Sequence, residues 1–450
     1  MATASSSGLS SVLHGGVDTI VARATPAGRG ALAVIRVSGP ETAAVAQRVC
    51  PEVDTGSGWR AGLATLRGAS GETLETAVVV AFPGPRSYTG EDMLEVTLHG
   101  SPYLVEAVID AFIAAGARRA GPGEFTRRAV ANGKLDLVQA EAVQDLIRAD
   151  VAWQVRLARE QLAGTLSRRF AEVRSALVCL LASLEASLDF AERDVVVEPG
   201  ELERQHDRCR GLVEELLATA SAGARIRDGV RVVILGGPNT GKSTLFNNLC
   251  GSERAIVSPH PGTTRDVLEA ELDLEGVRMV IQDTAGLRSG GDEVEKEGRR
   301  RAVGAAASAA VVLLLWPTDA CEGEEAPETP AGVAVLRVRS KADLPAGNPL
   351  NDGWLAVSCH TGEGLEALRE RLVRLVAGEI ADLGGEVAIA ERHRKALEQA
   401  MTELEACDLS RPELAAEGVR WAVRAVQEMT GEVDSDEVLD GVFSAFCIGK

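Results

Sequence analysis

The stretch Gly236–Ser243, which reads GGPNTGKS, constrains the fold of this chain more than any other. It fits the pattern G-x-x-x-x-G-K-[ST] and lies between an apolar run, residues 230–235, and a helix-like segment that begins at Gly241. Backbone N–H groups of such a turn, at the positive end of a helix, bind the phosphates of a nucleotide. The alternative, a chance glycine-rich loop that binds no ligand, would not explain why an apolar run precedes the loop and a helix-like segment follows it. The pattern therefore predicts a strand, a phosphate-binding loop and a helix.

Two residues of this loop have expected chemical roles. Lys242 is expected to reach the β- and γ-phosphates, which makes it a candidate catalytic residue, and Ser243 is expected to bind Mg²⁺. The loop residues expected to contact the nucleotide are Asn239, Thr240, Gly241, Lys242, Ser243 and Thr244.

Length and charge limit the class of protein. A chain of 450 residues, 45% of them hydrophobic, is long enough for about three domains. Its formal net charge of −19 argues against a broad basic face for nucleic acid, because phosphate neutralisation dominates such binding. Any contact with nucleic acid should therefore be local or shared with a partner.

The cysteines and the N-terminus indicate a cytoplasmic protein. The eight cysteines contain no C-x-x-C pair, so neither a zinc site nor a disulfide framework is indicated. No apolar run approaches the roughly 18 residues that span a bilayer. Residues 1–16 are rich in Ser, Ala and Gly and lack the features of a signal or transit peptide, so we expect a loose tail.

The glycine and proline content and the spacing of apolar residues change along the chain. Short apolar runs alternate with Pro-Gly turns up to residue 133, whereas glycine and proline nearly vanish after Lys134 and apolar residues follow helical spacing. The helical spacing of apolar residues resumes near residue 378. We therefore expect a nucleotide-binding domain inserted into one helical domain. The expected parts are a tail (1–16), a folate-binding and dimerising α/β domain on the resemblance given below (17–133), a helical part (134–223), a doubly wound α/β domain (224–377) and a second helical part (378–450).

Individual elements follow from the same patterns. In the first domain we expect strands at 31–37, 77–82 and 93–98, and helices after Pro40 and at 102–114. In the helical tract, apolar faces predict helices around 138–147, 173–188 and 202–220. In the insert, strands are expected at 230–235, 268–274, 277–282, 309–316 and 333–338, in a mostly parallel sheet.

Two further elements of the insert are typical of a GTPase. Asp283 begins a D-x-x-G stretch at a strand end, where Asp283 can bind Mg²⁺ through water and Gly286 can donate its N–H to the γ-phosphate. The stretch PGTTRD places Thr264 to complete the shell of Mg²⁺ ligands. Each fragment alone is equally compatible with an ordinary turn. The residues that these elements add to the expected nucleotide site are Ser258, Thr263, Thr264, Asp283, Thr284, Ala285 and Gly286.

Guanine specificity usually requires N-K-x-D, and here the sequence reads Ser340-Lys341-Ala342-Asp343. Asp343 can accept hydrogen bonds from the two guanine N–H groups that adenine lacks. A serine hydroxyl is shorter than an amide and cannot contact both the base and the phosphate loop, so we expect weaker nucleotide binding than with asparagine. Ser358, Cys359 and His360 follow a later apolar run and are expected to form the final base-contact loop.

Long blocks outside these motifs resemble the MnmE family of tRNA-modifying GTPases, also called TrmE. The matching segments are GTTRD and DTAGLR in the insert, and TIVARATPAGRGALAVIRVSG, FPGPRSYTGEDMLEVTLHG, PGEFTRRAVANGKLDLVQAEAV and the terminal FCIGK outside it. In that family, a folate-binding, dimerising N-terminal domain precedes a helical domain that the GTPase domain interrupts.

The resemblance implies a substrate, a partner and cofactors. It implies a homodimer that works with an FAD-dependent partner, MnmG, in a heterotetramer, with the FAD on the partner only. The complex would add a carboxymethylaminomethyl or aminomethyl group at C5 of the wobble uridine in certain tRNAs. The carbon would come from a 5-formyl- or 5,10-methylene-tetrahydrofolate. The implied folate contacts are Arg36, Glu95, Lys134 and Lys450.

The resemblance also implies how hydrolysis is assisted. Members of the family bind K⁺ when two GTPase domains meet, and the implied ligands are Asn239, Ser258, His260 and Thr263. Glu295 matches the glutamate that orients the attacking water, although on the sequence alone it is one acid among many. Cys447 is the implied catalytic thiol; a small buried hydrophobic residue is the alternative reading of this position.

Two other classes of function stay open at this point. A GTPase that regulates ribosome assembly would carry an added basic, aromatic RNA-binding module, and a membrane-remodelling GTPase would carry a lipid-binding segment. Neither feature is found in the sequence. The blocks in the first domain and the terminal CIGK favour the tRNA-modifying class.

Overall fold

The computed structural model describes residues 18–56, 58–189, 200–252, 254–255, 268–283, 304–319, 329–345, 353–382, 389–431 and 436–450. Contacts group the chain into two compact units, which we describe separately. Unit 1 comprises Met1–Gln144, Ser167–Val178 and Arg420–Lys450, and unit 2 comprises Asp145–Leu166 and Cys179–Val419. These units do not coincide with the domain boundaries expected at residues 134, 224 and 378, which stay a prediction.

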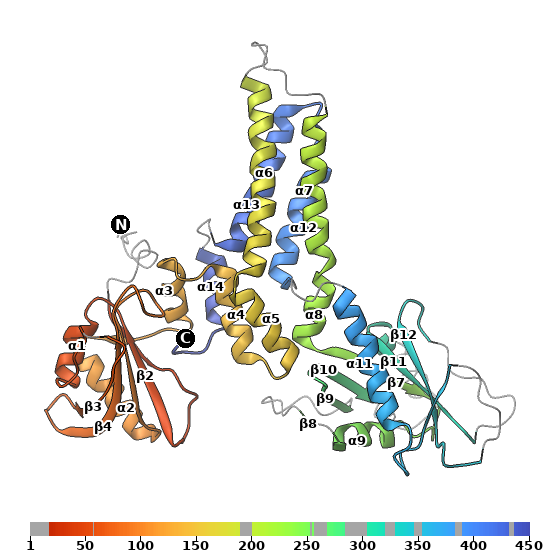
Figure 1. The fold of residues 1–450 in the computed structure, drawn as a ribbon, viewed down its shortest axis with the longest axis horizontal. Helices are drawn as coiled ribbons and strands as arrows, with labels where there is room; N and C mark the ends of the chain where they lie inside the picture. The colour runs from red at the N-terminus through yellow and green to blue at the C-terminus, as the bar shows by residue number, and fades with distance from the viewer. Residues whose placement is uncertain are drawn as a thin grey trace, which may run out of the picture. The chain divides into compact units, whose positions relative to one another are not determined.

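Unit 1 contains a six-stranded sheet in the order β3-β4-β5-β2-β1-β6 (Figure 1). Its neighbouring strands are antiparallel except for the parallel pair β1 and β6. The strands are β1 Ile20–Arg23, β2 Leu32–Ser38, β3 Ala61–Arg67, β4 Thr73–Phe82, β5 Met93–His99 and β6 Arg118–Arg119. The three strands expected in this domain are confirmed. β3 was not predicted, because its first residues are exposed and Leu63 is among them, so no clear alternation marks it.

Helices α1 (Thr42–Val49) and α2 (Pro102–Ala114) pack on this sheet, and α3 (Glu124–Ala131) follows it in the chain. The buried face of α2 carries Val105, Val108, Ile109 and Phe112, which join the core of the sheet. Pro102 lies in the first turn of α2, where its missing N–H leaves no hydrogen bond unmade. The expected helix at 102–114 is therefore confirmed at both ends.

The helical parts of the chain contain eight further helices outside the α/β insert, counted over the described residues. They are α4 Leu137–Arg148, α5 Ala152–Leu162, α6 Thr165–Asp189, α7 Glu201–Ala218, α8 Ala220–Asp228, α12 Glu391–Glu405, α13 Pro412–Thr430 and α14 Asp436–Ser444. The third expected helix, at 202–220, is α7, which ends two residues earlier and is followed by α8. No helix in the described part of the chain is long and apolar enough to cross a membrane.

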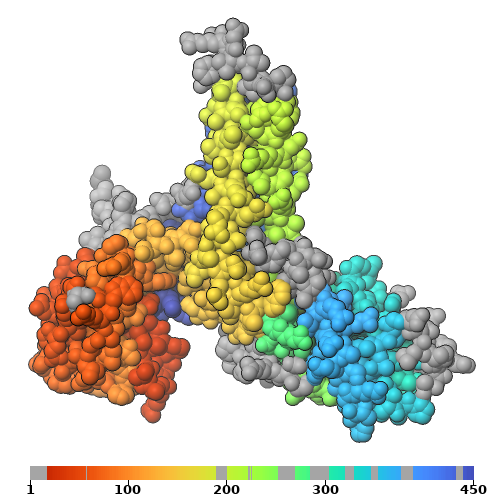
Figure 2. Space-filling view, viewed as in Figure 1, coloured from red at the N-terminus to blue at the C-terminus, as the bar shows by residue number. Residues whose placement is uncertain are grey.

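Helix α7 illustrates why these segments are helical. Cys209, Val213 and Leu216 recur at helical spacing and are buried, and the charged Glu214 and Glu215 between them are exposed. In the space-filling view, α7 forms a yellow-green column at the surface (Figure 2). Within unit 2, it packs against α12, where His206 Nε2 lies 2.8 Å from the carbonyl oxygen of Leu404.

The insert forms a seven-stranded sheet in the order β13-β12-β11-β7-β10-β9-β8. Its elements are β7 Val230–Gly236, α9 Lys242–Ser252, β8 Arg254–Ala255, β9 Leu268–Leu274, β10 Val277–Asp283, β11 Val311–Pro317, β12 Ala334–Ser340, β13 Leu355–Val357 and α11 Leu365–Asp382. The five central strands from β13 to β10 are parallel, and β9 pairs antiparallel with β10 and β8. The predicted doubly wound, mostly parallel fold is confirmed.

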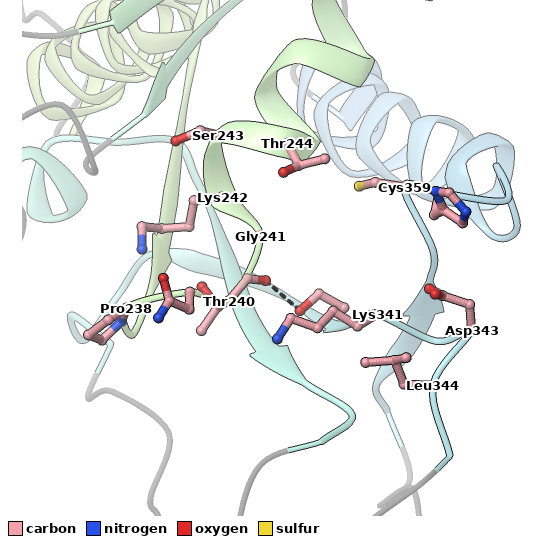
Figure 3. A pocket seen from close by; sticks show the side chains of 13 residues that line it. Pro238, Thr240, Gly241, Lys242, Ser243, Thr244, Lys341, Asp343, Leu344 and Cys359 are labelled. Carbon is pink, nitrogen blue, oxygen red and sulfur yellow. Dashed lines mark hydrogen bonds between the residues drawn. The ribbon is translucent and has the colours of Figure 1, made fainter.

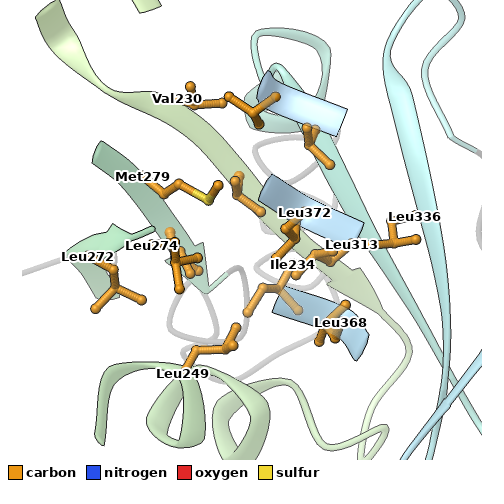
Figure 4. Packing of buried hydrophobic residues seen from close by; sticks show 14 of the residues in the cluster. Val230, Ile234, Leu249, Leu272, Leu274, Met279, Leu313, Leu336, Leu368 and Leu372 are labelled. Atoms are coloured by element: carbon orange, nitrogen blue, oxygen red, sulfur yellow. The ribbon is translucent and has the colours of Figure 1, made fainter. Parts of the chain in front are cut away.

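The core of the insert lies between this sheet and its helices (Figure 4). Ile234 and Leu313 of neighbouring parallel strands are fully buried and meet Leu368 and Leu372 of α11. Strands buried in this way consist of continuous apolar residues, as β11 does throughout and as β7 does from Val232 to Leu235. Because the centre of the sheet is rigidly packed, the loops at the carboxyl ends of its strands have a fixed support.

Candidate nucleotide-binding site

The phosphate loop joins β7 to α9 and needs glycine at defined positions. Gly241 has a φ of +90°, a conformation that side chains with a Cβ rarely adopt. At Gly236, a Cβ would lie 2.8 Å from the carbonyl oxygen of Leu315 and 2.7 Å from Thr240 Oγ1. The spacing of the motif is therefore set by sterics, and the loop residues from Pro238 to Ser243 line the pocket drawn in Figure 3.

Lys242 is buried at the start of α9 although it carries a charge. Its Nζ donates hydrogen bonds to the carbonyl oxygens of Gly236, at 3.0 Å, and Gly237, at 2.7 Å. These bonds hold the ammonium group inside the loop. A buried cation of this kind is suited to phosphate oxygens, because charge-assisted hydrogen bonds are stronger than neutral ones.

Ser243 and Asp283 form the second polar pair of the site. Ser243 Oγ donates a hydrogen bond to Asp283 Oδ2 at 2.7 Å, and Asp283, the last residue of β10, is fully buried. A hydroxyl and a carboxylate are the oxygen ligands that Mg²⁺ prefers, and Mg²⁺ usually keeps waters and binds substrate phosphates as well. The two side chains therefore fit the expected Mg²⁺ position.

A pocket of about 560 Å³ extends from the phosphate loop to the ends of β12 and β13. Its volume lies within the range of roughly 300–1,000 Å³ that is usual for small-molecule sites. The residues that line it are Pro238, Asn239, Thr240, Gly241, Lys242, Ser243, Thr244, Ser340, Lys341, Asp343, Leu344, Cys359 and His360. The structure thus brings together the two predicted halves of the nucleotide site (Figure 3).

Asp343 is exposed at the base-recognition end of this pocket. Its Oδ1 accepts a hydrogen bond from Ser358 Oγ at 2.6 Å, and this bond lowers the pKa of the Asp343 carboxyl below its usual value. Ser358 is buried and also accepts hydrogen bonds from the backbone N–H groups of His360 and Thr361. Asp343 is therefore held as a carboxylate with free acceptor capacity for the guanine N–H groups.

Ser340 makes one of the two contacts that an asparagine would make there. Its Oγ donates a hydrogen bond to the carbonyl oxygen of Thr240 at 2.6 Å, shown as the dashed line in Figure 3. Ser340 is buried, and its own carbonyl oxygen accepts hydrogen bonds from the N–H and the Oγ1 of Thr318. The serine therefore keeps the hydrogen bond that joins the base-contact loop to the phosphate loop. It lacks the second contact, which an asparagine would make to the base.

We predict that Ser340→Asn binds GDP more tightly, by up to about tenfold, because one hydrogen bond contributes about 0.5–1.5 kcal/mol. Ser340→Ala, the matched control, should bind GDP more weakly than the wild type, because it loses the bond to Thr240. Titration calorimetry of the three proteins checks both changes. Equal GDP affinity of wild type and Ser340→Asn would contradict this account of the substitution.

Sequence reasoning missed Asp319, which lies two residues after β11 and is exposed. Its carboxylate oxygens lie 3.1 and 3.3 Å from Lys341 Nζ. Lys341 has a φ of +58°, so the chain turns sharply here and directs the side chain along the pocket. The signal in the sequence was an acid directly after a buried parallel strand, at the edge of the sheet where ligands bind.

Several expected site residues lie outside the described residues. These are Ser258, His260, Thr263, Thr264, Thr284, Ala285, Gly286 and Glu295. Of the expected K⁺ ligands, Asn239 is described. It lines the pocket in a left-handed conformation with a φ of +57°.

In unit 1, three of the four expected folate contacts lie near one another. Arg36 Nη2 bonds Glu95 Oε1 at 2.7 Å, and Arg36 Nη1 donates to the carbonyl oxygen of Gly449 at 3.4 Å. Burial lowers the pKa of Lys450, and the charge of Arg36 adds to this while Glu95 opposes it. Lys134 Nζ instead donates to the carbonyl oxygen of Pro85 at 3.0 Å.

Cys447 is exposed, whereas its neighbour Phe446 is buried beside Phe443. The alternative reading of Cys447 as a small buried hydrophobic residue is therefore wrong. The backbone holds the segment in place, since Ile448 forms a β-bridge with Pro122 and the N–H of Gly123 bonds the Cys447 carbonyl oxygen at 3.4 Å. The thiol is therefore accessible on a segment that is held by a β-bridge and a backbone hydrogen bond.

A phosphate loop, a serine–aspartate pair and a guanine-recognition loop on a doubly wound sheet define a P-loop nucleotide-binding domain of the GTPase class. Family models cover the parts of the chain on either side. The model of the GTP-binding protein TrmE N-terminus matches residues 19–134, and the model of the MnmE helical domain matches residues 137–447. The chain therefore belongs to the MnmE family of tRNA modification GTPases, as its sequence blocks predict.

Relatives named tRNA modification GTPase MnmE are similar to this chain along nearly its whole length. One from Xanthomonas campestris pv. campestris (strain B100) is 41% identical over 446 residues, which cover 96% of this chain and 99% of the relative. One from Thermus thermophilus is 43% identical over 437 residues, with 96% and 99% covered. One from Methylorubrum populi is 44% identical over 448 residues, with 96% and 98% covered.

Proposed function

We propose that this chain hydrolyses GTP within a complex that adds a carboxymethylaminomethyl or aminomethyl group at C5 of the wobble uridine in certain tRNAs. The observation that carries the GTPase part is the single pocket that has Lys242 and Ser243 at one end and Asp343 at the other. These groups match the phosphate and guanine ends of one nucleotide. The tRNA substrate follows from the name of the relatives.

The residues of the pocket have distinct tasks in hydrolysis. Lys242 holds the β- and γ-phosphates, and Asp343 selects guanine. Ser243 would hold Mg²⁺ directly and Asp283 would hold it through water, and Asn239 would contribute to a K⁺ site; when bound, these cations supply positive charge against the phosphates. Glu295 and Thr264 complete the proposed set, as the residues that orient water and bind Mg²⁺.

The N-terminal domain supplies the one-carbon unit in this proposal. Arg36, Lys134 and Lys450 are suited to the carboxylates of a folate, and Glu95 is suited to its pterin N–H groups. The close approach of Arg36 to Glu95 and to Gly449, the neighbour of Lys450, supports a common site for these charges. We further propose a cytoplasmic homodimer, formed through residues 17–133, that works with an FAD-dependent MnmG partner.

GTP turnover should be faster in K⁺ than in Na⁺ by at least about tenfold, because a cation of the right size at Asn239 stabilises the charge that develops on the phosphates. Asn239→Ala should remove the difference and leave only the slow rate. Steady-state phosphate release in matched K⁺ and Na⁺ buffers checks this. Equal rates of the wild type in the two salts would refute a working cation site.

The experiment that tests the proposed function is nucleoside mass spectrometry of tRNA from cells that lack this gene. We expect C5-aminomethyl-type wobble uridines to disappear and to return with the wild-type gene. Cys447→Ser should fail to restore them if the exposed thiol is catalytic, whereas Cys179→Ser, a change at another exposed cysteine, should restore them. Unchanged nucleosides after deletion would contradict the proposed function and favour a regulatory GTPase.

A further inference from the structure

Strand β10 joins the nucleotide pocket to the helices that flank the sheet within unit 2. Its last residue, Asp283, bonds Ser243 in the pocket. Its first residue, Val277, follows a tight turn in which Glu275 and Gly276 have φ values of +51° and +86°. Between these ends, β10 is paired with β7 on one side and with β9 on the other. A strand held on both edges moves as a rigid element.

Helix α5 is docked on that turn. The backbone N–H of Trp153 donates a hydrogen bond to the carbonyl oxygen of Gly276 at 3.2 Å. A Cβ at Gly276 would lie 3.1 Å from the Cβ of Ala152, so the glycine allows the turn to approach the start of the helix. The position of α5 is thus tied directly to the end of β10 that lies away from the pocket.

Arg278 adds two ionic contacts between the sheet and the start of α5. Its Nη2 lies 2.7 Å from Glu271 Oε2 on β9, and its Nη1 lies 3.6 Å from Asp150 Oδ2, just before α5. The side chain is 21% exposed, so solvent screens these contacts only in part. One guanidinium therefore links the sheet to the helix.

Helix α5 is also hydrogen-bonded to helix α8. Gln154 Nε2 donates hydrogen bonds to the carbonyl oxygens of Ile226, at 3.2 Å, and Arg227, at 2.9 Å. Leu157 and Ile226 belong to the same apolar core as the strands of the sheet. Beside them lies a cavity of about 280 Å³, lined by both polar and apolar residues, and Arg278 and Gln154 are among them. The contact between α5 and the turn at Glu275 and Gly276 therefore depends on a few hydrogen bonds and ion pairs. Because a cavity lies next to these contacts, α5 can shift slightly without a steric clash.

We propose that Arg278 and Gly276 are positioning residues that couple the nucleotide contact of Asp283 to helices α5 and α8 through β10. The inference rests on the proposed binding of guanine nucleotide in the pocket. Coupling between two sites is reciprocal: nucleotide that fixes Asp283 steadies the docking of α5, and loss of the docking weakens nucleotide binding.

The test is hydrogen–deuterium exchange of the full chain with and without GDP, together with GDP titrations. In the wild type, GDP should slow exchange of the Trp153 amide by about fivefold or more, the lower end of typical coupling. In Arg278→Ala and Asp150→Asn, the GDP-dependent change should fall below about twofold and GDP affinity should fall with it. Arg278→Lys, which keeps the charge, should recover part of both effects.

Arg231→Ala is the matched control, since Arg231 is an exposed arginine on the neighbouring strand β7; it should behave as the wild type. The inference is overturned if GDP binds to the wild type without slowing exchange at Trp153, or if Arg278→Ala responds to GDP as the wild type does. Absence of GDP binding to the wild type would overturn the proposed nucleotide site as well.

Discussion

Lys242→Ala should lower the affinity for GTP by roughly a hundredfold and reduce turnover to background. The ammonium group of Lys242 is buried beside the carbonyl oxygens of Gly236 and Gly237, in the loop proposed to bind the phosphates. Hydrogen bonds to charged groups contribute about 1.5–3 kcal/mol each, so two lost contacts to phosphate correspond to about a hundredfold or more in affinity. Titration calorimetry and phosphate release measure the two effects.

The control for this prediction is Lys395→Ala, since Lys395 is an exposed lysine on α12 that pairs with Glu391 at 3.8 Å. It should bind and hydrolyse GTP as the wild type does. If Lys242→Ala kept nucleotide affinity within about threefold of the wild type, the loop would not be the phosphate site, and the interpretation of the motif would fail.

Asp343→Asn should change the base preference of the pocket from guanine to xanthine. The carboxylate of Asp343 is proposed to accept hydrogen bonds from both N–H groups of guanine, whereas an amide offers N–H donors that suit the second carbonyl of xanthine. Sites built on such hydrogen bonds discriminate strongly, because the wrong partner leaves polar groups unpaired. We expect GDP affinity to fall by about a hundredfold or more and XDP affinity to rise above that of the wild type.

Competition between GDP and XDP for a fluorescent nucleotide measures this exchange of specificity. Asp408→Asn, a change at an exposed aspartate after α12, should leave the ratio of the two affinities unchanged. The assignment of Asp343 would be wrong if its variant still preferred GDP by the wild-type ratio, even with lower overall affinity.

The sequence predicts those features of the fold and the site that depend on local backbone geometry. The phosphate loop was recognisable because its glycines and its lysine stand at spacings that the backbone itself requires. The strand at 309–316 was recognisable because buried parallel strands are continuous apolar runs, and the strand at 268–274 was recognisable because its apolar and acidic residues alternate. α5 was not predicted, because two of its buried residues, Gln154 and Gln161, are polar, and burial of Gln154 is tolerated only where the carbonyl groups of α8 accept its hydrogen bonds.

Contacts between distant parts of the chain could not be predicted in the same way. The bond from Ser340 to Thr240 joins residues 100 positions apart, and the pairing of Lys341 with Asp319 depends on how two strands end side by side. The sequence indicated that Ser340 departs from the usual asparagine, but the contact that it keeps became visible only in the folded chain. The exposure of Cys447 likewise depends on how the terminal segment pairs with Pro122.

The central claim is that the nucleotide in this pocket drives the modification of tRNA. The most direct test is a reconstituted reaction with the FAD-bound MnmG partner, 5,10-methylene-tetrahydrofolate as the carbon donor, glycine or ammonium as the nitrogen donor, and tRNA. Modified nucleosides are measured by mass spectrometry. Wild-type protein should support modification with GTP and not with XTP, and Asp343→Asn should support it with XTP and not with GTP. Modification by Asp343→Asn that proceeds with GTP as in the wild type, or without any nucleotide, would contradict the claim.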